Sequence, residues 1–254
     1  MTGEIPTAVI TGASSRIGGA VARDLANHGW RLVLHANANA HKAESLAQEL
    51  EGATGRPHVF TADLTEATGL ATFMDKASEP FGLPDVLINN ASIFEDDGIG
   101  HLDPDLFDQH FAIHTKAPLF LADAFAARLP KDRKGLIVSM IDQRVWKLTP
   151  QALSYSLSKS ALWTATQVLA QALAPNIRVN AIGPGPSFKN ERQSQAEFDK
   201  QAGAVLLKRG PDAEAFGRTV RFLWESPSIT GQMIALDGGQ HLAWQTPDVV
   251  DVGE

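Results

Sequence analysis

Short apolar runs alternate with longer amphipathic stretches along most of the chain. The short runs predict β-strands at residues 7–11, 31–36, 58–64, 85–91, 135–141, 177–183 and 232–237. The longer stretches predict helices at residues 17–28, 41–52, 104–129, 155–173 and 212–224, with another that begins near Glu66. This alternation is typical of βαβ units. It predicts an α/β fold with a doubly wound parallel sheet of about seven strands and helices on both faces.

Two places depart from the regular alternation. Asp103 and Pro104 have the residue types of a helix cap and a first helical residue, and Pro118 predicts a kink in the helix that follows. Residues 186–210 are polar, lack a strand signal and contain the isolated aromatic residues Phe188 and Phe198. Because the sequence has no repeat or linker, we expect one domain over residues 1–254 with an irregular insertion at about residues 186–210.

Composition narrows the class of protein. Hydrophobic residues make up 44% and charged residues 20% of the 254 residues, as in globular proteins. The net charge of −7 argues against a nucleic-acid surface and an anionic membrane face. The absence of cysteine excludes disulfides, a thiolate nucleophile and a cysteine-based metal site, and we expect no metal. The N-terminal residues do not resemble a signal peptide, and no run approaches the ~20 apolar residues of a membrane span, so we expect a cytoplasmic protein.

The segment TGASSRIG at residues 11–18 joins the first predicted strand to the first predicted helix. Gly12 and Gly18 allow the backbone to pass close to a pyrophosphate, and a helix N-terminus attracts phosphate. A tight strand-to-helix turn in any α/β protein has a similar composition, so this segment alone leaves both interpretations open. Arg16 occupies the position between the glycines where a dinucleotide-binding turn usually has another glycine.

Further polar residues follow the strands at the edge where parallel sheets bind ligands. Asp63 and Leu64 end the third predicted strand, and residues 89–92, with the sequence NNAS, end the fourth. Tyr155 and Lys159 lie four residues apart and so share one face of a predicted helix. A cation beside a phenol lowers the pKa of the phenol. We therefore expect Lys159 to let Tyr155 exchange a proton near neutral pH.

The order of these motifs, followed by IRVNAIGPG at residues 177–185, resembles the short-chain dehydrogenase/reductase family over nearly the whole chain. The resemblance implies a Rossmann-type sheet, a nicotinamide cofactor, a catalytic tyrosine that transfers the proton and a catalytic lysine that holds the nicotinamide ribose. Where the family has a serine that stabilises the substrate oxygen, this chain has Asp142. A carboxylate repels a developing alkoxide unless a raised pKa keeps it protonated, so Asp142 favours reduction of a C=N bond. The alternative is that Asp142 is a solvated turn residue of an inactive protein.

Three features are similar to the pteridine reductases within that family, namely Arg16, Asp142 and the pair Ser92 and Phe94. The segments IHTKAPLFL and LDGGQHL are similar to the bacterial dihydromonapterin reductases. The resemblance implies that Phe94 stacks the pterin ring against nicotinamide, where an aromatic stack contributes roughly 0.5–1.5 kcal/mol. It also implies that Asp142 and Tyr155 deliver the proton, and that Arg16 bridges the cofactor phosphate and the pterin.

The second predicted strand ends in HANANA at residues 35–40, without the acidic residue that binds the ribose hydroxyls in NAD-preferring proteins. We therefore expect NADP(H), with its 2′-phosphate held by His35, Asn37 and Asn39 together with Lys42. The residues expected to contact this cofactor are Gly12, Ser14, Ser15, Arg16, Ile17, Gly18, His35, Asn37, Asn39, Asp63, Leu64, Asn90, Ala91, Ser92, Tyr155, Lys159, Pro184, Gly185 and Ser187. Those expected to contact the substrate are Arg16, Ser92, Phe94, Asp142, Tyr155, Pro186 and Phe188.

Other parts of the resemblance concern the insertion, one histidine and the assembly. Residues 186–210 correspond to the family's substrate lid, where Phe188 and Phe198 either close on the substrate or pack the lid down. His114 replaces an asparagine that relays protons in many members, and both a relay and a structural role are open. Apolar residues surround the helix predicted at residues 155–173, and Trp244 lies near the C-terminus. We therefore expect a homotetramer, as in most of the family.

Together these features predict an NADPH-dependent reductase of a dihydropterin, such as dihydromonapterin or dihydrofolate. One alternative is a carbonyl reductase of the same family that acts on a ketone or a 3-oxoacyl substrate. The other is a non-catalytic dinucleotide-binding regulator, against which the presence of both Tyr155 and Lys159 argues.

Overall fold

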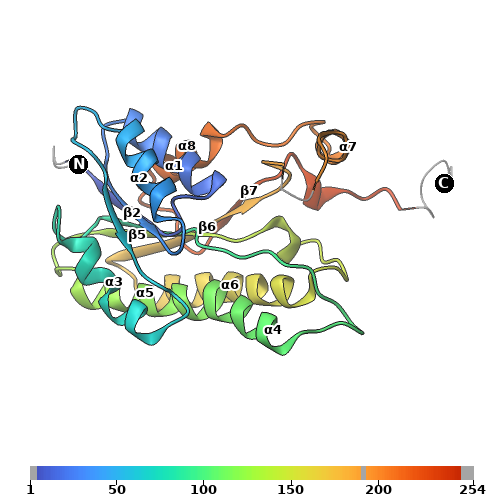
Figure 1. The fold of residues 1–254 in the computed structure, drawn as a ribbon, viewed down its shortest axis with the longest axis horizontal. Helices are drawn as coiled ribbons and strands as arrows, with labels where there is room; N and C mark the ends of the chain where they lie inside the picture. The colour runs from blue at the N-terminus through green and yellow to red at the C-terminus, as the bar shows by residue number, and fades with distance from the viewer. Residues whose placement is uncertain (1–4, 190–192, 247–254) are drawn as a thin grey trace.

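Seven parallel strands form one sheet in the order β3-β2-β1-β4-β5-β6-β7 (Figure 1). The computed structural model describes residues 5–189 and 193–246. The strands are β1 (Thr7–Ile10), β2 (Arg31–Ala36), β3 (His58–Thr61), β4 (Val86–Asn89), β5 (Gly135–Met140), β6 (Ile177–Pro184) and β7 (Met233–Leu236). The strand order reverses between β1 and β4, which is the switch point where an open parallel sheet binds ligands. The predicted doubly wound α/β fold is confirmed.

Helices cover both faces of the sheet (Figure 1). They are α1 (Arg16–Asn27), α2 (Ala40–Glu49), α3 (Ala67–Ser78), α4 (Pro104–Phe111), α5 (Ala117–Arg128), α6 (Leu153–Ala172), α7 (Gln195–Ala204) and α8 (Glu214–Glu225), with the shorter turns η1 (Ala112–Lys116), η2 (Gln143–Val145) and η3 (Gln240–Leu242). α1, α2 and α8 lie on one face, and α3 to α6 lie on the other. Within the two described ranges, no helix combines the length and the apolar character that a bilayer crossing requires.

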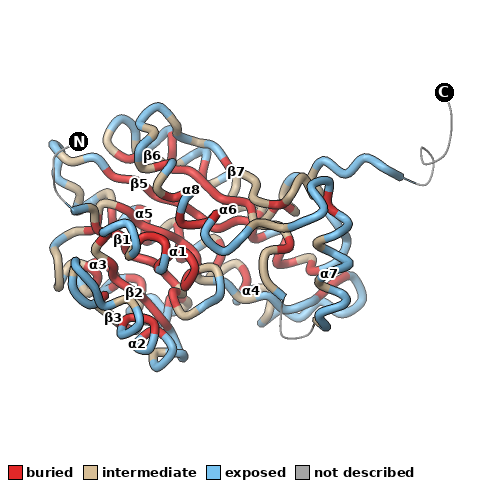
Figure 2. Tube along the Cα trace, turned by 90° about the horizontal axis from the view of Figure 1, so that it is seen from above, coloured by how far each residue is buried: buried red, intermediate tan, exposed pale blue. Residues whose placement is uncertain are grey.

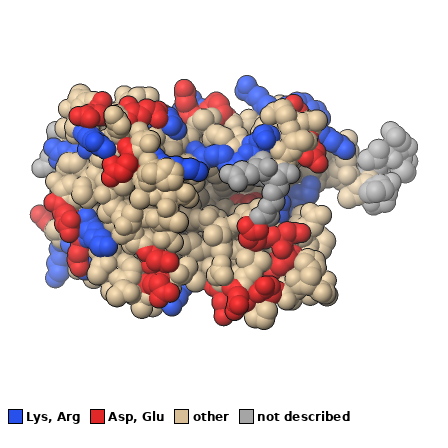
Figure 3. Space-filling view, viewed as in Figure 1, with Lys and Arg blue, Asp and Glu red and all other residues tan. Residues whose placement is uncertain are grey.

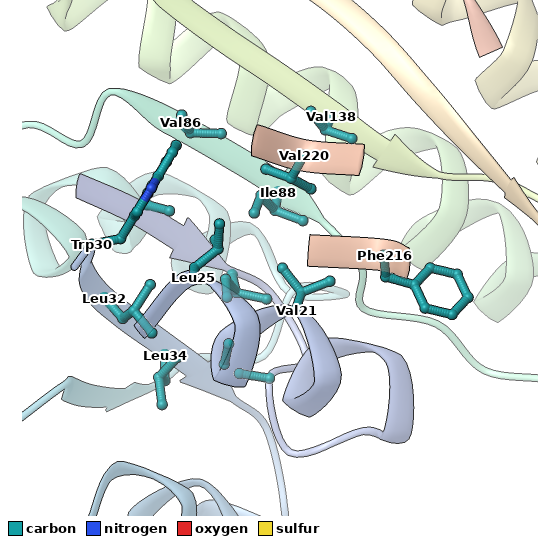
Figure 4. Close-up of a cluster of buried hydrophobic side chains, with 14 of the residues drawn as sticks. Val21, Leu25, Trp30, Leu32, Leu34, Val86, Ile88, Val138, Phe216 and Val220 are labelled. Atoms are coloured by element: carbon teal, nitrogen blue, oxygen red, sulfur yellow. The ribbon is translucent and has the colours of Figure 1, made fainter. Parts of the chain in front are cut away.

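The strands are apolar throughout because both faces of the sheet are packed against helices. On the side of α1 and α8, Leu25, Ile88 and Phe216 are fully buried in one cluster (Figure 4). On the other side, Leu87 and Phe125 are fully buried in a second cluster. Figure 2 shows the buried residues concentrated along the strands and the helix faces that touch them. This double core holds the loops at the carboxyl ends of the strands on a rigid base.

The helix predicted over residues 104–129 is interrupted by a π-helical turn. It begins as predicted, because the Asp103 carboxylate accepts hydrogen bonds from the N–H groups of Asp105 and Leu106. η1 is the π-helical turn, and α5 follows it directly. Pro118 has no N–H, and its ring collides with the carbonyl of the residue four positions earlier in a regular α-helix. The wider turn accommodates the proline. The predicted kink therefore lies just before Pro118, in a turn that contains His114.

The segment at residues 186–210 contains a helix, α7, that the sequence did not predict. Ser194 and Glu197 form a capping box in which the side chain of each accepts a hydrogen bond from the backbone N–H of the other. No residue of α7 is buried, so the helix has no apolar face that periodicity detects. Residues 190–192 of this segment lie outside the described part of the chain.

Candidate active site

Four loops meet at the carboxyl ends of the central strands. They follow β1, β4, β5 and β6 and contain residues 11–15, 90–97, 141–152 and 185–189. Figure 3 shows a hollow between the two helical layers, with Lys and Arg side chains along one rim and Asp and Glu side chains along the other. Most of the residues predicted for the site lie on these loops or on the helices that follow them.

The turn between β1 and α1 packs closely against the loop that follows β4. Gly12 has a φ of +63°, and a Cβ atom built on it would lie 2.8 Å from Ala91 Cα. A Cβ atom on Gly18 would lie 2.6 Å from the carbonyl oxygen of Gly12 and 2.7 Å from Asn90 Nδ2. Ser15 caps α1, since its Oγ accepts a hydrogen bond from the N–H of Gly18. Both glycines are therefore required by the packing of the turn itself.

Asn90 holds this turn in place from the neighbouring loop. Its Nδ2 donates to the carbonyl oxygens of Thr11 and Gly12, both at 2.9 Å, and lies 3.1 Å from Ser15 Oγ. The Thr11 hydroxyl accepts hydrogen bonds at 2.9 Å from the N–H groups of Asn90 and Ala91. The predicted cofactor residue Asn90 therefore acts within the protein as a brace for the first turn.

His35 is not placed to contact a phosphate, which corrects the prediction for it. The residue is 2% exposed and packs between Phe60 and Phe73. Its Nδ1 accepts a hydrogen bond from the N–H of Gly12 at 3.3 Å, and its Nε2 lies 2.8 Å from the carbonyl oxygen of Ala62. Burial lowers the pKa of His35 to about 4, so the ring is neutral and donates from Nε2. His35 supports the first turn from inside the protein.

The other residues predicted to hold the 2′-phosphate lie on the surface. Asn37, Asn39 and Lys42 are exposed around the start of α2. Asp63, after β3, is also exposed, and its Oδ1 accepts hydrogen bonds from the N–H and the hydroxyl of Thr65. These bonds from Thr65 lower the pKa of Asp63, and a hydrogen bond from Asn37 adds to the effect. Leu64, predicted with Asp63, is 2% exposed and belongs to the core.

The three predicted catalytic residues are brought together between β5 and α6. Tyr155 Oη donates a 3.0 Å hydrogen bond to Asp142 Oδ2. Lys159 Nζ lies 5.7 Å from the centroid of the Tyr155 ring and donates to the carbonyl oxygen of Met140 at 2.8 Å. Tyr155 is 7% exposed and Lys159 is 3% exposed, so both titrating groups are nearly removed from water.

Burial controls the protonation of these three groups. It raises the pKa of Asp142, against the opposing effect of the hydrogen bond from the Arg144 N–H. Burial and the Asp142 carboxyl group raise the pKa of Tyr155 well above its ordinary value. Burial lowers the pKa of Lys159 to about 8. The expectation that Lys159 lowers the pKa of Tyr155 is therefore wrong for this arrangement. Lys159 Nζ donates its hydrogen bond to the carbonyl oxygen of Met140, and Tyr155 Oη donates to Asp142 instead.

Phe94 lies next to the catalytic tyrosine and is open to solvent. Its ring meets the Tyr155 ring edge to face, with centroids 4.8 Å apart, and the residue is 43% exposed. The guanidinium carbon of Arg144 lies 5.4 Å from the centroid of Phe94. No motif in the sequence singles out Arg144. Its position after β5, two residues beyond Asp142, was the available signal, because ligands bind where parallel strands end.

His114 connects the Phe94 loop to α6. It is 1% exposed, with Nδ1 2.9 Å from Ser158 Oγ and Nε2 2.8 Å from Ser92 Oγ. Ser158 Oγ donates to the carbonyl oxygen of Tyr155, so His114 Nδ1 donates to Ser158 and Nε2 accepts from Ser92 and from the Ile93 N–H. Burial, with the charge of Lys159, lowers the pKa of His114. The ring is therefore neutral and fixes the loop that carries Phe94.

The segment after β6 is joined to the first turn. Arg16 Nη1 donates to the carbonyl oxygen of Lys189, and the arginine is otherwise exposed. Phe188 is partly buried and packs against the Phe216 ring, with centroids 6.2 Å apart, at the border of the core cluster beside α8. The prediction of Phe188 as a substrate contact is corrected, because its ring packs this segment onto α8. Arg16 stands at the border between the turn and the insertion.

The remaining predicted residues of this segment are held by close packing. Pro184 ends β6, and a Cβ atom on Gly185 would lie 2.6 Å from Asp237 Cα. Pro186 is buried, and the Ser187 hydroxyl donates to the carbonyl oxygen of Gly185 at 3.0 Å.

In the described parts of the chain, no group of three or more His, Asp or Glu side chains is placed to bind a metal ion.

Known proteins are similar to this chain in fold and in sequence. The sequence model of a family described as enoyl-(acyl carrier protein) reductase matches residues 12–241. The crystal structure of FolM alternative dihydrofolate reductase 1 from Brucella suis in complex with NADP is 50% identical, with a TM-score of 0.94 over 98% of this chain and 100% of that one. The same protein from Brucella canis, complexed with NADP, is 49% identical, with a TM-score of 0.93 over 96% of this chain and 97% of that one. Oxidoreductase YjdA of Bacillus subtilis, which is uncharacterized, is 32% identical over 91% of this chain and 95% of its own length.

Proposed function

Because the chain belongs to the short-chain dehydrogenase/reductase family, we propose that it is an NADPH-dependent enzyme that reduces a C=N bond of a dihydropterin. The substrate class includes dihydromonapterin, dihydrofolate and dihydrobiopterin, the last of which yields tetrahydrobiopterin. The reaction adds a hydride to carbon and a proton to nitrogen and leaves NADP⁺ and the tetrahydropterin. The observation that carries this proposal is the hydrogen bond between Tyr155 and Asp142.

NADP(H) is the cofactor, as in both Brucella structures. The turn after β1 fits a dinucleotide, because α1 begins there after a glycine-containing loop and a helix N-terminus attracts phosphate. No acidic residue ends β2, so nothing in residues 35–40 repels a 2′-phosphate, and Asn37 and Asn39 are exposed to hold it. Lys159 and Ser187 would hold the nicotinamide end. When bound, the cofactor supplies the hydride.

The Asp142 and Tyr155 pair suits protonation of a nitrogen. Burial raises the pKa of both groups, which favours their protonated forms in a site with little water. In its protonated form, Asp142 can replace the proton that the phenol gives up, because the two oxygens are already hydrogen bonded. A serine in the place of Asp142 would stabilise an alkoxide but would supply no second acidic proton.

The side chains of Phe94 and Arg16 are suited to bind a flat, electron-rich substrate. The Phe94 ring is 43% exposed beside Tyr155 and offers a face on which a heteroaromatic ring can stack. Arg16 lies where the phosphate-binding turn meets the insertion, so its guanidinium can contact both the cofactor and a substrate with carbonyl and amine groups. Ser92, in the loop after β4, and Pro186, in the loop after β6, complete the proposed substrate site.

An NADPH oxidation assay with purified protein tests the proposal. Dihydromonapterin, dihydrofolate and dihydrobiopterin form one panel, and small ketones and a 3-oxoacyl thioester form the other. We expect turnover of at least one dihydropterin, with product identified as the tetrahydropterin. Good turnover of the carbonyl panel with none of the dihydropterins would assign a carbonyl reductase instead. Tight NADPH binding without turnover of either panel would assign a non-catalytic binding protein.

We also propose that the enzyme is a cytoplasmic homotetramer in which residues 186–210 act as the substrate lid. Phe120 on α5 and Leu157 and Val168 on α6 are 55%, 46% and 57% exposed, which supports burial of these helices against other subunits. Trp244, at 63% exposure, offers a further contact. Sedimentation of the purified protein tests this assembly, and a monomer at micromolar concentration would refute it.

A further inference from the structure

Arg144 has a buried nitrogen with no hydrogen-bond partner. Its Nη1 is enclosed by the protein, and no acceptor within the described residues is in reach of it. Leaving a charged donor buried and unpaired costs free energy. Other arginines of this protein are paired, for example Arg128 with Asp75 and Arg221 with Asp24. Because Arg144 as a whole is only partly buried, a rotation of its side chain brings this nitrogen within reach of an acceptor from outside the chain.

The surroundings of Arg144 are those of the proposed substrate site. Its guanidinium carbon lies 5.4 Å from the centroid of the exposed Phe94 ring. Its backbone N–H donates to Asp142 Oδ1 at 2.8 Å, while Asp142 Oδ2 accepts from Tyr155. The residue that carries the unpaired donor thus contacts both the proposed stacking platform and the pair that delivers the proton.

The short helical turn that carries Arg144 is anchored at its other end. Trp146 lies against the His241 ring, with centroids 5.1 Å apart. His241 Nδ1 is 2.7 Å from Asp237 Oδ2, and Asp237 is 2% exposed. Asp142 caps the turn at its start. Because both ends of the turn are fixed, a ligand group that accepts a hydrogen bond from Arg144 does not need to order the loop.

We propose that Arg144 recognises the substrate by donating a hydrogen bond to the carbonyl oxygen next to the nitrogen that is protonated. This inference rests on the proposed function. In a 7,8-dihydropterin the C=N nitrogen and the 4-oxo oxygen point to the same edge of the fused rings. A donor beside Asp142 and Tyr155 therefore meets that oxygen when the nitrogen faces the proton donors. Arg144 would select pteridines with oxygen at this position over those with an amino group, which presents a donor to a donor.

Binding measurements with a matched ligand pair test the role of Arg144. The ligands are pterin, with an oxygen at position 4, and 2,4-diaminopteridine, with an amino group there. Each is titrated against NADP-saturated wild type, Arg144→Met, Arg144→Lys and the control Arg128→Met, which removes a guanidinium from the surface of α5. We expect Arg144→Met to weaken pterin binding by about tenfold or more, as for loss of a hydrogen bond from a charged group. Binding of 2,4-diaminopteridine should change much less, and Arg128→Met should match the wild type.

Kinetics and stability separate recognition from a structural role. With a dihydropterin substrate, Arg144→Met should raise KM far more than it lowers kcat, while NADPH affinity and the unfolding midpoint stay close to those of the wild type. If the Met variant does not fold, Arg144→Lys keeps the charge and tests loss of the planar donor group. Equal weakening of both ligands, or unchanged pterin binding, would overturn the assignment of Arg144 alone. If the wild type binds no pterin at all, the proposed function fails and the assignment fails with it.

Discussion

Tyr155 donates a 3.0 Å hydrogen bond to Asp142, and the two residues approach from different elements. Asp142 follows β5 and caps η2, whereas Tyr155 lies in the first turn of α6. Burial raises the pKa of both groups. The Asp142 carboxyl group raises the pKa of Tyr155 further, whereas the hydrogen bond from Tyr155 opposes the rise in the pKa of Asp142. The pair lies beside the exposed Phe94 ring, and its role in delivering a proton can be tested directly.

Replacement of Asp142 by serine should impair pterin reduction. The variant loses the second acidic group, and we expect kcat/KM for a dihydropterin to fall by about 10²- to 10⁴-fold. NADPH affinity should change little, because Asp142 bonds to Tyr155 and to the Arg144 N–H. Asp75→Ser, on the surface of α3, is the control and should keep full activity. Full pterin activity in Asp142→Ser would show that C=N chemistry does not depend on this carboxyl group.

Because the Lys159 ammonium group is buried, the free energy of unfolding should depend on pH in the alkaline range. Its pKa is lowered from 10.5 to about 8 in the folded protein, so the folded state binds fewer protons than the unfolded state between these values. The contribution of Lys159 to the free energy of unfolding therefore rises with pH across this window, by about 3 kcal/mol in total. Urea unfolding of the wild type and Lys159→Met at several pH values measures the difference. A difference that stays constant from pH 8 to 10.5 would contradict the lowered pKa.

His35 and Asn39 should have separable effects on the cofactor. His35→Ala removes two buried hydrogen bonds and ring contacts, and we expect a loss of about 2–4 kcal/mol in the free energy of unfolding. The variant should also weaken the binding of NADPH and of NADH to a similar extent.

Asn39→Asp places a carboxylate on the exposed start of α2, where it repels a 2′-phosphate. It should lower the NADPH-to-NADH ratio of kcat/KM by about tenfold without a loss of stability. An unchanged ratio would show that the 2′-phosphate does not bind near Asn39.

A pair of adjacent glycines tests the packing of the first turn. A Cβ atom on Gly18 would lie 2.6 Å from the carbonyl oxygen of Gly12, whereas one on Gly19 would meet first the flexible end of Arg23, at 3.1 Å. Gly18→Ala should therefore displace the turn and weaken NADPH binding by about tenfold or more, since loss of a few hydrogen bonds from the turn is enough for this change. Gly19→Ala should bind NADPH like the wild type. Isothermal titration calorimetry measures both, and equal affinities would show that the turn tolerates a side chain at Gly18.

The sequence by itself determined the order of the seven strands along the chain and the edge of the sheet that carries the site. Continuous apolar runs separated by amphipathic stretches produce strands buried on both faces, so the alternation alone predicts the parallel sheet. The spacing of Tyr155 and Lys159 placed them on one face of α6. These features depend on contacts between residues close in the chain, or on a period that any parallel sheet imposes.

Only the tertiary structure decided which side chains are free to bind a ligand. His35 has the type and position of a phosphate ligand, yet its ring lies inside the core with both nitrogens engaged. Phe188 packs onto α8, and Arg144, which no motif singles out, holds an unpaired nitrogen beside Phe94. Burial, charge and hydrogen bonding at these positions arise from neighbours far away in the sequence. The type of a residue limits the chemistry that its side chain can perform. Its solvent exposure and its hydrogen-bond partners decide whether that side chain is available to a ligand.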